Sequence, residues 1–160
     1  LIAQSAAPVR TTGGMLVMPH HTLADCPPLD LLLVPGGWGT RAEVDNRTLI
    51  DWIAARGAAI ETLTSVCTGS FLLAQAGLLD GRRVTTHWRS LERMRDTYPQ
   101  VRVVFDRHWV DDGRVVTSAG ISAGIDMALR LVARFHGDAI ARATARHMEY
   151  PYPASDERRI

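Results

Sequence analysis

A single cysteine between a strand pattern and a helix pattern places the strongest constraint on this chain. Residues 59–64 favour a β-strand, and residues 70–76 form an apolar helical run that stops at Gly77. Cys67 lies in the tight turn between them, close to helix amide groups that have no intrahelical partner. Such a turn lifts a side chain out of the backbone, as a nucleophile elbow does. The segment therefore predicts a strand–turn–helix unit with a cysteine at its tip.

Two interpretations of Cys67 follow from this position. Helix amide groups stabilise a thiolate, which is the reactive form of cysteine. Their contribution is at most about 1–2 kcal/mol, so full activation needs a second group from elsewhere in the fold. The neighbours Val66 and Thr68 are uncharged and do not supply it. The alternative is a small, inert cysteine in the core, which describes most lone cysteines.

Strand and helix patterns alternate along the whole chain. A short apolar run at 29–34 is typical of a buried parallel strand, and Asp45 or Asn46 can cap a helix that ends at Gly57. Further strands are expected at 84–86, 101–105, 109–110 and 115–117, the last two as a hairpin, and further helices at about 90–97, 121–137 and 138–148. This alternation predicts an α/β fold with a mostly parallel sheet and helices on both faces. Ligands bind such sheets at the carboxyl ends of the strands.

The pattern at 121–137 is the most regular helical one. Asp126 and Arg130 stand one turn apart, on the opposite face from the apolar stripe, where they can pair. The predicted buried stripe consists of Ile121, Ile125, Ala128, Leu129, Val132 and Phe135.

Composition narrows the classes of function. With 160 residues, 46% of them hydrophobic, the chain is large enough for one domain with a full core. A net charge of +1 gives no electrostatic reason to expect binding to nucleic acid or to an anionic membrane surface. The apolar runs are much shorter than the ~20 residues of a membrane span, and no signal-peptide pattern is present. We therefore expect a cytoplasmic protein that binds neither.

The sequence gives no reason to expect a metal or a cofactor. Cys26 and Cys67 lie far apart, without metal-ligand spacing, and two cysteines do not make a disulfide framework. The glycine pair at 36–37 lacks the lysine of a P-loop and the spacing of a dinucleotide fingerprint. His20 and His21 are adjacent, and neighbouring residues of a strand face opposite ways.

The glycine pair is nevertheless a candidate part of the site, because it follows a strand as Cys67 does. We expect Gly36 to adopt a positive φ, which glycine tolerates. Gly37 can in addition aim its amide at the cysteine, as an oxyanion donor would.

Three ring side chains also lie near expected strand ends. His87 follows the strand at 84–86 and is either structural or a titratable group of the site. Trp38 and Trp88 flank the two strand ends and either wall an apolar pocket or pack in the ordinary way.

The first four residues read as the inside of a strand with no turn before them. We expect that a first strand and helix precede Leu1, and that residues 1–160 form a single domain that lacks them.

Five blocks, in order, resemble the ThiJ/PfpI superfamily. They are LLVPGG at 32–37, VCTGS at 66–70, AGLLDG at 76–81, TTHW at 85–88 and TSAGISAGID at 117–126. The resemblance implies a flavodoxin-like three-layer sandwich with a mostly parallel central sheet. It also implies a homodimer whose elbow cysteine lies in a pocket near the subunit interface.

The residue after the cysteine distinguishes branches of this superfamily. Members that resemble the intracellular proteases and glyoxalases carry a histidine there, whereas this chain has Thr68. That departure argues against a Cys–His dyad and against proteolysis. The CTG, TTHW and AGID blocks are instead similar to isocyanide hydratases and, equally, to the amino-terminal domains of AraC-type transcription regulators.

These two resemblances imply different functions for one pocket, which Gly37, Trp38, His87 and Trp88 are expected to line. In the hydratases the cysteine, here Cys67, attacks the carbon of a small electrophilic substrate. The following threonine assists, and an acidic residue near the first strand handles protons. No residue here matches that acid, so we expect it upstream of Leu1.

The regulators imply a non-catalytic domain that senses a small ligand. The sequence contains no helix-turn-helix pattern, so this chain itself is not expected to contact nucleic acid. That observation favours the enzyme.

Overall fold

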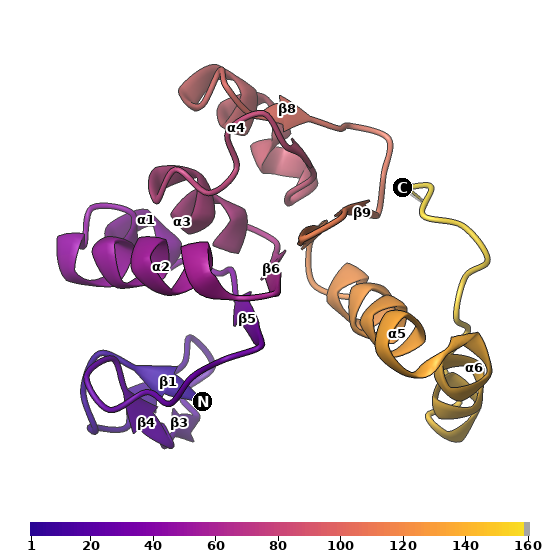
Figure 1. Ribbon diagram of the computed structural model, residues 1–160, viewed down its shortest axis with the longest axis horizontal. Coiled ribbons are helices and arrows are strands. Elements are labelled where there is room, and N and C mark those ends of the chain that lie inside the picture. The colour runs from indigo at the N-terminus through magenta and orange to yellow at the C-terminus, as the bar shows by residue number, and fades with distance from the viewer. Residues whose placement is uncertain (159–160) are drawn as a thin grey trace.

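The computed structural model describes residues 1–158 and contains a sheet with helices on both faces (Figure 1). The central sheet has the strand order β5 (Leu31–Val34), β6 (Thr62–Val66), β10 (Val115–Ser118) and β9 (Trp109–Asp112). β5, β6 and β10 run parallel, and β9 pairs with β10 in antiparallel orientation. The expected α/β fold and the hairpin are therefore confirmed, with strand ends that differ from the predicted ones by a few residues.

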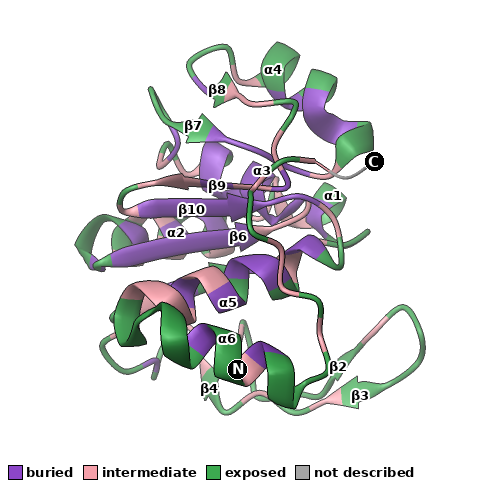
Figure 2. Cartoon of the chain, turned by 90° about the vertical axis from the view of Figure 1, so that its right-hand side faces the viewer, coloured by how far each residue is buried: buried purple, intermediate pink, exposed green. Residues whose placement is uncertain are grey.

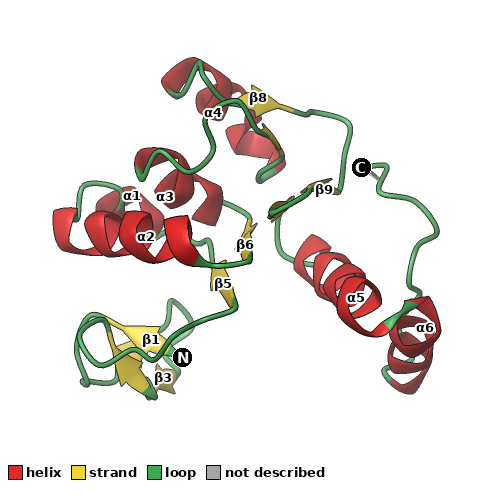
Figure 3. Ribbon diagram, in the orientation of Figure 1, coloured by secondary structure: helices red, strands yellow, loops and turns green. Residues whose placement is uncertain are grey.

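The helices form two layers around this sheet (Figure 3). One layer holds α1 (Thr40–Glu43), α2 (Arg47–Ala59) and α3 (Gly69–Gln75), and the other holds α5 (Ala123–His136) and α6 (Asp138–His147). Between α3 and β9 the chain forms four short elements, which are β7 (Arg83–Val84), η1 (Trp88–Ser90), α4 (Leu91–Thr97) and β8 (Arg102–Val103). Two small pairs, β1 (Ile2–Ala3) with β4 (His21–Thr22) and β2 (Val9–Arg10) with β3 (Leu16–Val17), complete the fold.

The two inner strands of the central sheet, β6 and β10, are buried almost throughout, as Figure 2 shows. Leu63 of β6, Leu73 of α3 and Met94 of α4 are fully buried in the larger apolar cluster. Val116 of β10 packs with Met127 of α5 in a smaller cluster. The fully buried strand expected at β5 is therefore only half confirmed: Leu32 and Val34 are buried, whereas Leu33 is 41% exposed.

The predicted end of α2 was wrong. Asn46 caps the helix by accepting a 3.3 Å hydrogen bond from the amide of Leu49, but the helix passes through Gly57 to Ala59. Gly57 is buried, and a Cβ atom there would lie 2.4 Å from Leu78 Cδ1. This glycine permits close packing and does not stop the helix.

The predicted buried face of α5 was also largely wrong. Ile121 precedes the helix and is 84% exposed, and Ile125 and Phe135 are exposed as well. Leu129 is buried as expected. The other residues of α5 that are buried are Ala123, Asp126, Met127 and Leu131.

Asp126 explains part of this difference. Its carboxylate is fully buried, 3.0 Å from His108 Nε2, and it accepts a 3.0 Å hydrogen bond from the Tyr150 hydroxyl. The expected partner, Arg130, instead lies 3.3 Å from Asp111. A charge can be buried when polar groups surround it, and here those groups come from other segments of the chain.

Residues 1–158 include no cluster of three or more His, Cys, Asp or Glu side chains suited to hold a metal ion. Every helix in the same part of the chain falls short of the length and hydrophobicity that a membrane crossing demands.

Candidate functional site

Cys67 occupies a strained turn between β6 and α3. Its φ is +57°, in the left-handed region that costs a non-glycine residue about 1–2 kcal/mol. Its amide donates to the carbonyls of Ser118 and Ala119, at 3.1 and 3.2 Å. Its carbonyl accepts from Thr86 Oγ1 at 2.8 Å and from Ser70 Oγ at 3.1 Å. Strain of this kind persists only where surrounding contacts fix the backbone, as these four do.

The end of β5 packs directly against this turn. A Cβ atom on Gly36 would lie 2.6 Å from the Thr68 amide nitrogen and 2.8 Å from Cys67 Cβ. Gly36 does not have a positive φ, so that expectation was wrong; Gly37 does, at +127°. Gly36 is needed because the backbone after β5 contacts the backbone of the Cys67 turn. Gly37 is needed because its φ is positive, which glycine tolerates.

The hydroxyl of Thr68 belongs to a polar cluster with Gly37 and Thr40. The Gly37 amide donates to Thr68 Oγ1 at 3.1 Å, and the Gly37 carbonyl lies 3.2 Å from Thr68 Oγ1. Thr40 Oγ1 lies 3.0 Å from Thr68 Oγ1 and 2.8 Å from the Gly37 carbonyl. The Gly37 amide is therefore engaged by Thr68, and it would have to exchange this bond to act as the predicted oxyanion donor.

His87 lies beside the same turn, since it follows Thr86, whose hydroxyl binds the Cys67 carbonyl. Its Nδ1 accepts a 3.3 Å hydrogen bond from the Arg89 amide, and a Cβ atom on Gly120 would lie 2.4 Å from its Cδ2. Partial burial lowers the pKa of His87 below its ordinary value of 6.5, and the positive charges of Arg89 and Arg158 lower it further. This environment favours a neutral imidazole.

The two tryptophans at the strand ends are not in the core. Trp38 is 71% exposed and Trp88 is 51% exposed. The guanidinium carbon of Arg41 lies 4.2 Å from the Trp38 ring centroid, and that of Arg89 lies 4.9 Å from the Trp88 ring centroid. The Trp88 ring also stacks with His87, at 5.9 Å between centroids. Both rings are thus available at the surface, and their role as pocket walls stays a prediction.

The second cysteine has a different environment. Cys26 is 6% exposed, and its thiol donates a 3.4 Å hydrogen bond to the carbonyl of Pro27. Both cysteines are free, and Cys67 is only partly buried.

Several residues that support the Cys67 turn were not predicted. Ser70 and Thr86 lie inside blocks that the sequence singles out, so those blocks were the available signal. Arg158 had no such signal. It comes from the tail, where its guanidinium donates to Thr85 Oγ1 at 2.9 Å and lies 3.5 Å from the Thr86 carbonyl.

Comparison with known proteins points to one family. The family model described as DJ-1/PfpI matches residues 1–134. An isonitrile hydratase of Pseudomonas putida is 39% identical over 159 residues, which cover 98% of this chain and 68% of the relative. The HTH-type transcriptional regulator CdhR of Pseudomonas aeruginosa is 36% identical over 141 residues, 88% of this chain. The chain spans only 41% of that regulator's length.

Solved structures agree with this assignment. A ThiJ/PfpI family protein from Pseudomonas syringae matches with a TM-score of 0.87 and 33% identity, over 98% of this chain and 64% of that protein. An AraC family transcriptional regulator from Pseudomonas putida matches with a TM-score of 0.72 over 92% of this chain and 78% of that one; at 23% identity it supports the fold alone. With the family match and the P. putida relative, these similarities show that the chain belongs to the DJ-1/PfpI family.

Proposed function

We propose that this chain is an isocyanide hydratase-like enzyme in which Cys67 forms a covalent adduct with a small electrophilic substrate. The observation that carries the proposal is the strained backbone of Cys67, held by four hydrogen bonds at the carboxyl ends of β6 and β10. The 39% identity to an isonitrile hydratase supports the choice of substrate class. Strain of this sort is found at functional sites more often than elsewhere.

The proposed reaction hydrates an isocyanide to an N-substituted formamide. The sulfur of Cys67 attacks the terminal carbon, a C–S bond forms, and that carbon gains a proton, which gives a thioimidate. Water then adds to the same carbon, the nitrogen gains a proton, and the C–S bond breaks to release the formamide and the free thiol. One isocyanide and one water are consumed, and no oxidant or reductant is required.

The proton transfers require an acid and a base near the adduct. We propose that a carboxylate within about 2.6–3.2 Å of the thiol serves this purpose, the usual reach of a catalytic pair.

The decisive test follows formamide formation from a simple alkyl isocyanide. We expect saturable turnover that Cys67→Ala abolishes and that Cys26→Ala leaves unchanged, because Cys26 is buried and bound to Pro27. Binding of the isocyanide without any product, in the protein as encoded, would contradict the enzyme.

Thr68 offers a second test of the same mechanism. Thr68→Val keeps the β-branched shape but removes the hydroxyl that lies among Gly37 and Thr40. We expect lower turnover and a loss of about 1–3 kcal/mol in the free energy of unfolding, because the Gly37 amide loses its hydrogen-bond acceptor. Thr40→Val is the matched control, since it disturbs the same cluster without changing the residue next to Cys67. Unchanged turnover in Thr68→Val would remove the hydroxyl from the mechanism.

A ligand-sensing domain is the second candidate, favoured by the 36% identity to the regulator CdhR. Such a domain would use the surface around Cys67 to bind a small molecule without consuming it. In that case Cys67→Ala would keep ligand binding, and the isocyanide assay would give no product with any form of the protein.

We also propose that the protein forms a homodimer through the edge that carries Cys67. Three exposed apolar side chains, Trp38, Trp88 and Ile121, follow β5, β7 and β10 there. Burial of such side chains stabilises an interface. Sedimentation at micromolar concentration should give about twice the chain mass, and Ile121→Glu should give the monomer. A monomeric parent protein would contradict the proposal.

A further inference from the structure

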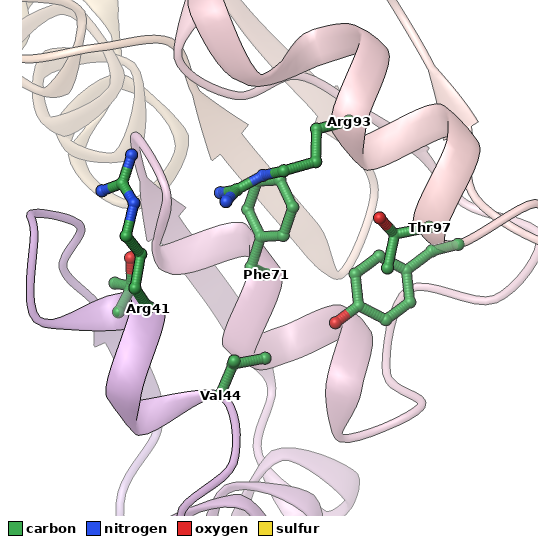
Figure 4. Close-up of a pocket in the computed structure, with 7 residues that line it drawn as sticks. Arg41, Val44, Phe71, Arg93 and Thr97 are labelled. Atoms are coloured by element: carbon green, nitrogen blue, oxygen red, sulfur yellow. The ribbon is translucent and has the colours of Figure 1, made fainter.

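A pocket of about 220 Å³ lies between α1, α3 and α4 (Figure 4). Phe71 and Tyr98 give it an aromatic wall, with ring centroids 6.0 Å apart and planes at 68°. Val44 adds an aliphatic side chain. Within residues 1–158, neither Cys67 nor Thr68 lines this pocket, so it is distinct from the thiol.

Two arginines supply the charge of this pocket. The guanidinium of Arg93 lies over the Phe71 ring, with its carbon 4.2 Å from the ring centroid, and in Figure 4 it extends toward the side of the pocket that holds Arg41. The Arg41 guanidinium carbon lies 4.2 Å from the Trp38 ring centroid. Both guanidiniums thus rest on aromatic rings, which limits their freedom and leaves their edges available for hydrogen bonds.

These arginines differ from the arginines of residues 1–158 that pair with a carboxylate. In the described part of the chain, neither forms an ion pair with a carboxylate, whereas Arg130 and Arg134 share Asp111 and Arg142 pairs with Asp138. Two positive charges at one pocket repel each other, and an anion between them removes that repulsion.

The other polar residues that line the pocket carry hydroxyl groups, which both donate and accept hydrogen bonds. They include Thr97 and Thr40, and the Thr40 hydroxyl already donates to the Gly37 carbonyl. The pKa of the Tyr98 hydroxyl is raised, mainly because the group is partly buried. The positive charge of Arg93 lowers this pKa, and the negative charge of Asp45 raises it. Asp45 does not itself line the pocket.

We propose that this pocket binds a small organic carboxylate, with the carboxylate on Arg41 and Arg93 and the apolar body against Phe71 and Tyr98. Guanidinium groups bind carboxylates in a two-bond geometry, and the aromatic wall suits an apolar ring or chain. Inorganic phosphate would use the arginines but would leave the aromatic wall without a partner. The volume is below the range of drug-sized pockets, so the ligand is metabolite-sized.

Isothermal titration with benzoate tests this proposal, with benzamide as the uncharged analogue and inorganic phosphate as the purely ionic one. Benzoate should bind, and both other compounds should bind more weakly. Arg93→Gln and Arg41→Gln should each weaken benzoate binding by about 10- to 100-fold, the effect of losing a hydrogen bond to a charged group. Circular dichroism should show that both variants stay folded. If one variant has a folding defect, benzoate binding by the other variant still tests the proposal.

Two controls make the outcome specific. Arg95→Gln removes an exposed arginine from the same helix, where it pairs with Asp96, and should leave benzoate binding unchanged. Cys67→Ala should also keep it, which separates this proposal from the proposed enzyme function. The proposal would be overturned if benzamide bound as tightly as benzoate or if phosphate bound more tightly than benzoate. It would also be overturned if both pocket variants kept wild-type affinity for benzoate, or if Cys67→Ala lost benzoate binding.

Discussion

The segments around the two cysteines differ in what fixes them. Cys67 is partly accessible, and its backbone has an unfavourable positive φ. Four hydrogen bonds from surrounding residues hold the backbone in this conformation and offset its cost. Cys26 is buried, without a positive φ, and its thiol binds a neighbouring carbonyl. Backbone strain together with exposure, and not cysteine chemistry as such, therefore distinguishes Cys67 as the candidate nucleophile.

The largest expected effect is on alkylation rates. Iodoacetamide reaches Cys67 directly, whereas Cys26 must wait for local opening of the fold. An opening free energy of about 3 kcal/mol would make Cys26 about 100-fold slower. Peptide mapping after timed labelling measures both rates in one sample. Preferential labelling of Cys26 would contradict the difference in accessibility between the two cysteines.

The next effect concerns the close packing behind Cys67. Gly36→Ala places a Cβ atom 2.6 Å from the Thr68 amide nitrogen, so the backbone must shift. We expect a loss of about 2–3 kcal/mol in the free energy of unfolding, measured with urea, and slower labelling of Cys67.

Gly13→Ala is the matched control for that variant. Within residues 1–158, no atom lies within 4 Å of a Cβ atom built at Gly13, and the φ of Gly13 is not positive. Its free energy of unfolding should stay within about 0.5 kcal/mol of the parent value. Similar losses in both variants would show that the packing of Gly36 against the turn does not limit stability.

A smaller effect tests the strain itself. Because glycine accepts a φ of +57° freely, Cys67→Gly should be more stable than Cys67→Ala by about 1 kcal/mol. At Cys26 the order should reverse, since glycine there only adds flexibility to the unfolded chain. Urea unfolding of the four variants checks both orders. A Cys67→Gly protein that is less stable than Cys67→Ala would show that the turn is not strained.

The smallest effect is the pH dependence contributed by His87. Its pKa is lowered in the folded protein, so below about 6.5 the unfolded chain takes up this proton first. Stability is then lost as the pH falls below that value and is recovered as it rises. His87→Gln should therefore show a smaller difference in the free energy of unfolding between pH 7.5 and 5.5 than the parent protein. An unchanged difference would mean that the imidazole is not kept neutral by the fold.

Local patterns in the sequence determined much of this protein. The run from β6 through Cys67 into α3, the parallel arrangement of β5 and β6, and the β9–β10 hairpin are all encoded in short stretches whose propensities agree with the fold. The position of Cys67 at the carboxyl edge of the sheet was predictable because the residue directly follows a parallel strand.

The burial of Asp126 and the need for glycine at two positions depend on tertiary contacts, which local sequence patterns do not encode. Asp126 is buried because His108 and Tyr150, from distant segments, meet it, and this overrides the apolar stripe drawn from helical spacing. Gly36 and Gly57 are required by close contacts with Thr68 and Leu78.

The arginine pocket is likewise a product of tertiary structure. It joins Arg41 to Arg93, which are 52 positions apart in the chain and belong to different helices. The physical reason is common to all these cases. Helix and strand periodicity depends on neighbours within a few residues, whereas burial of a charge, close backbone contact and a shared pocket depend on side chains that only the folded chain brings together.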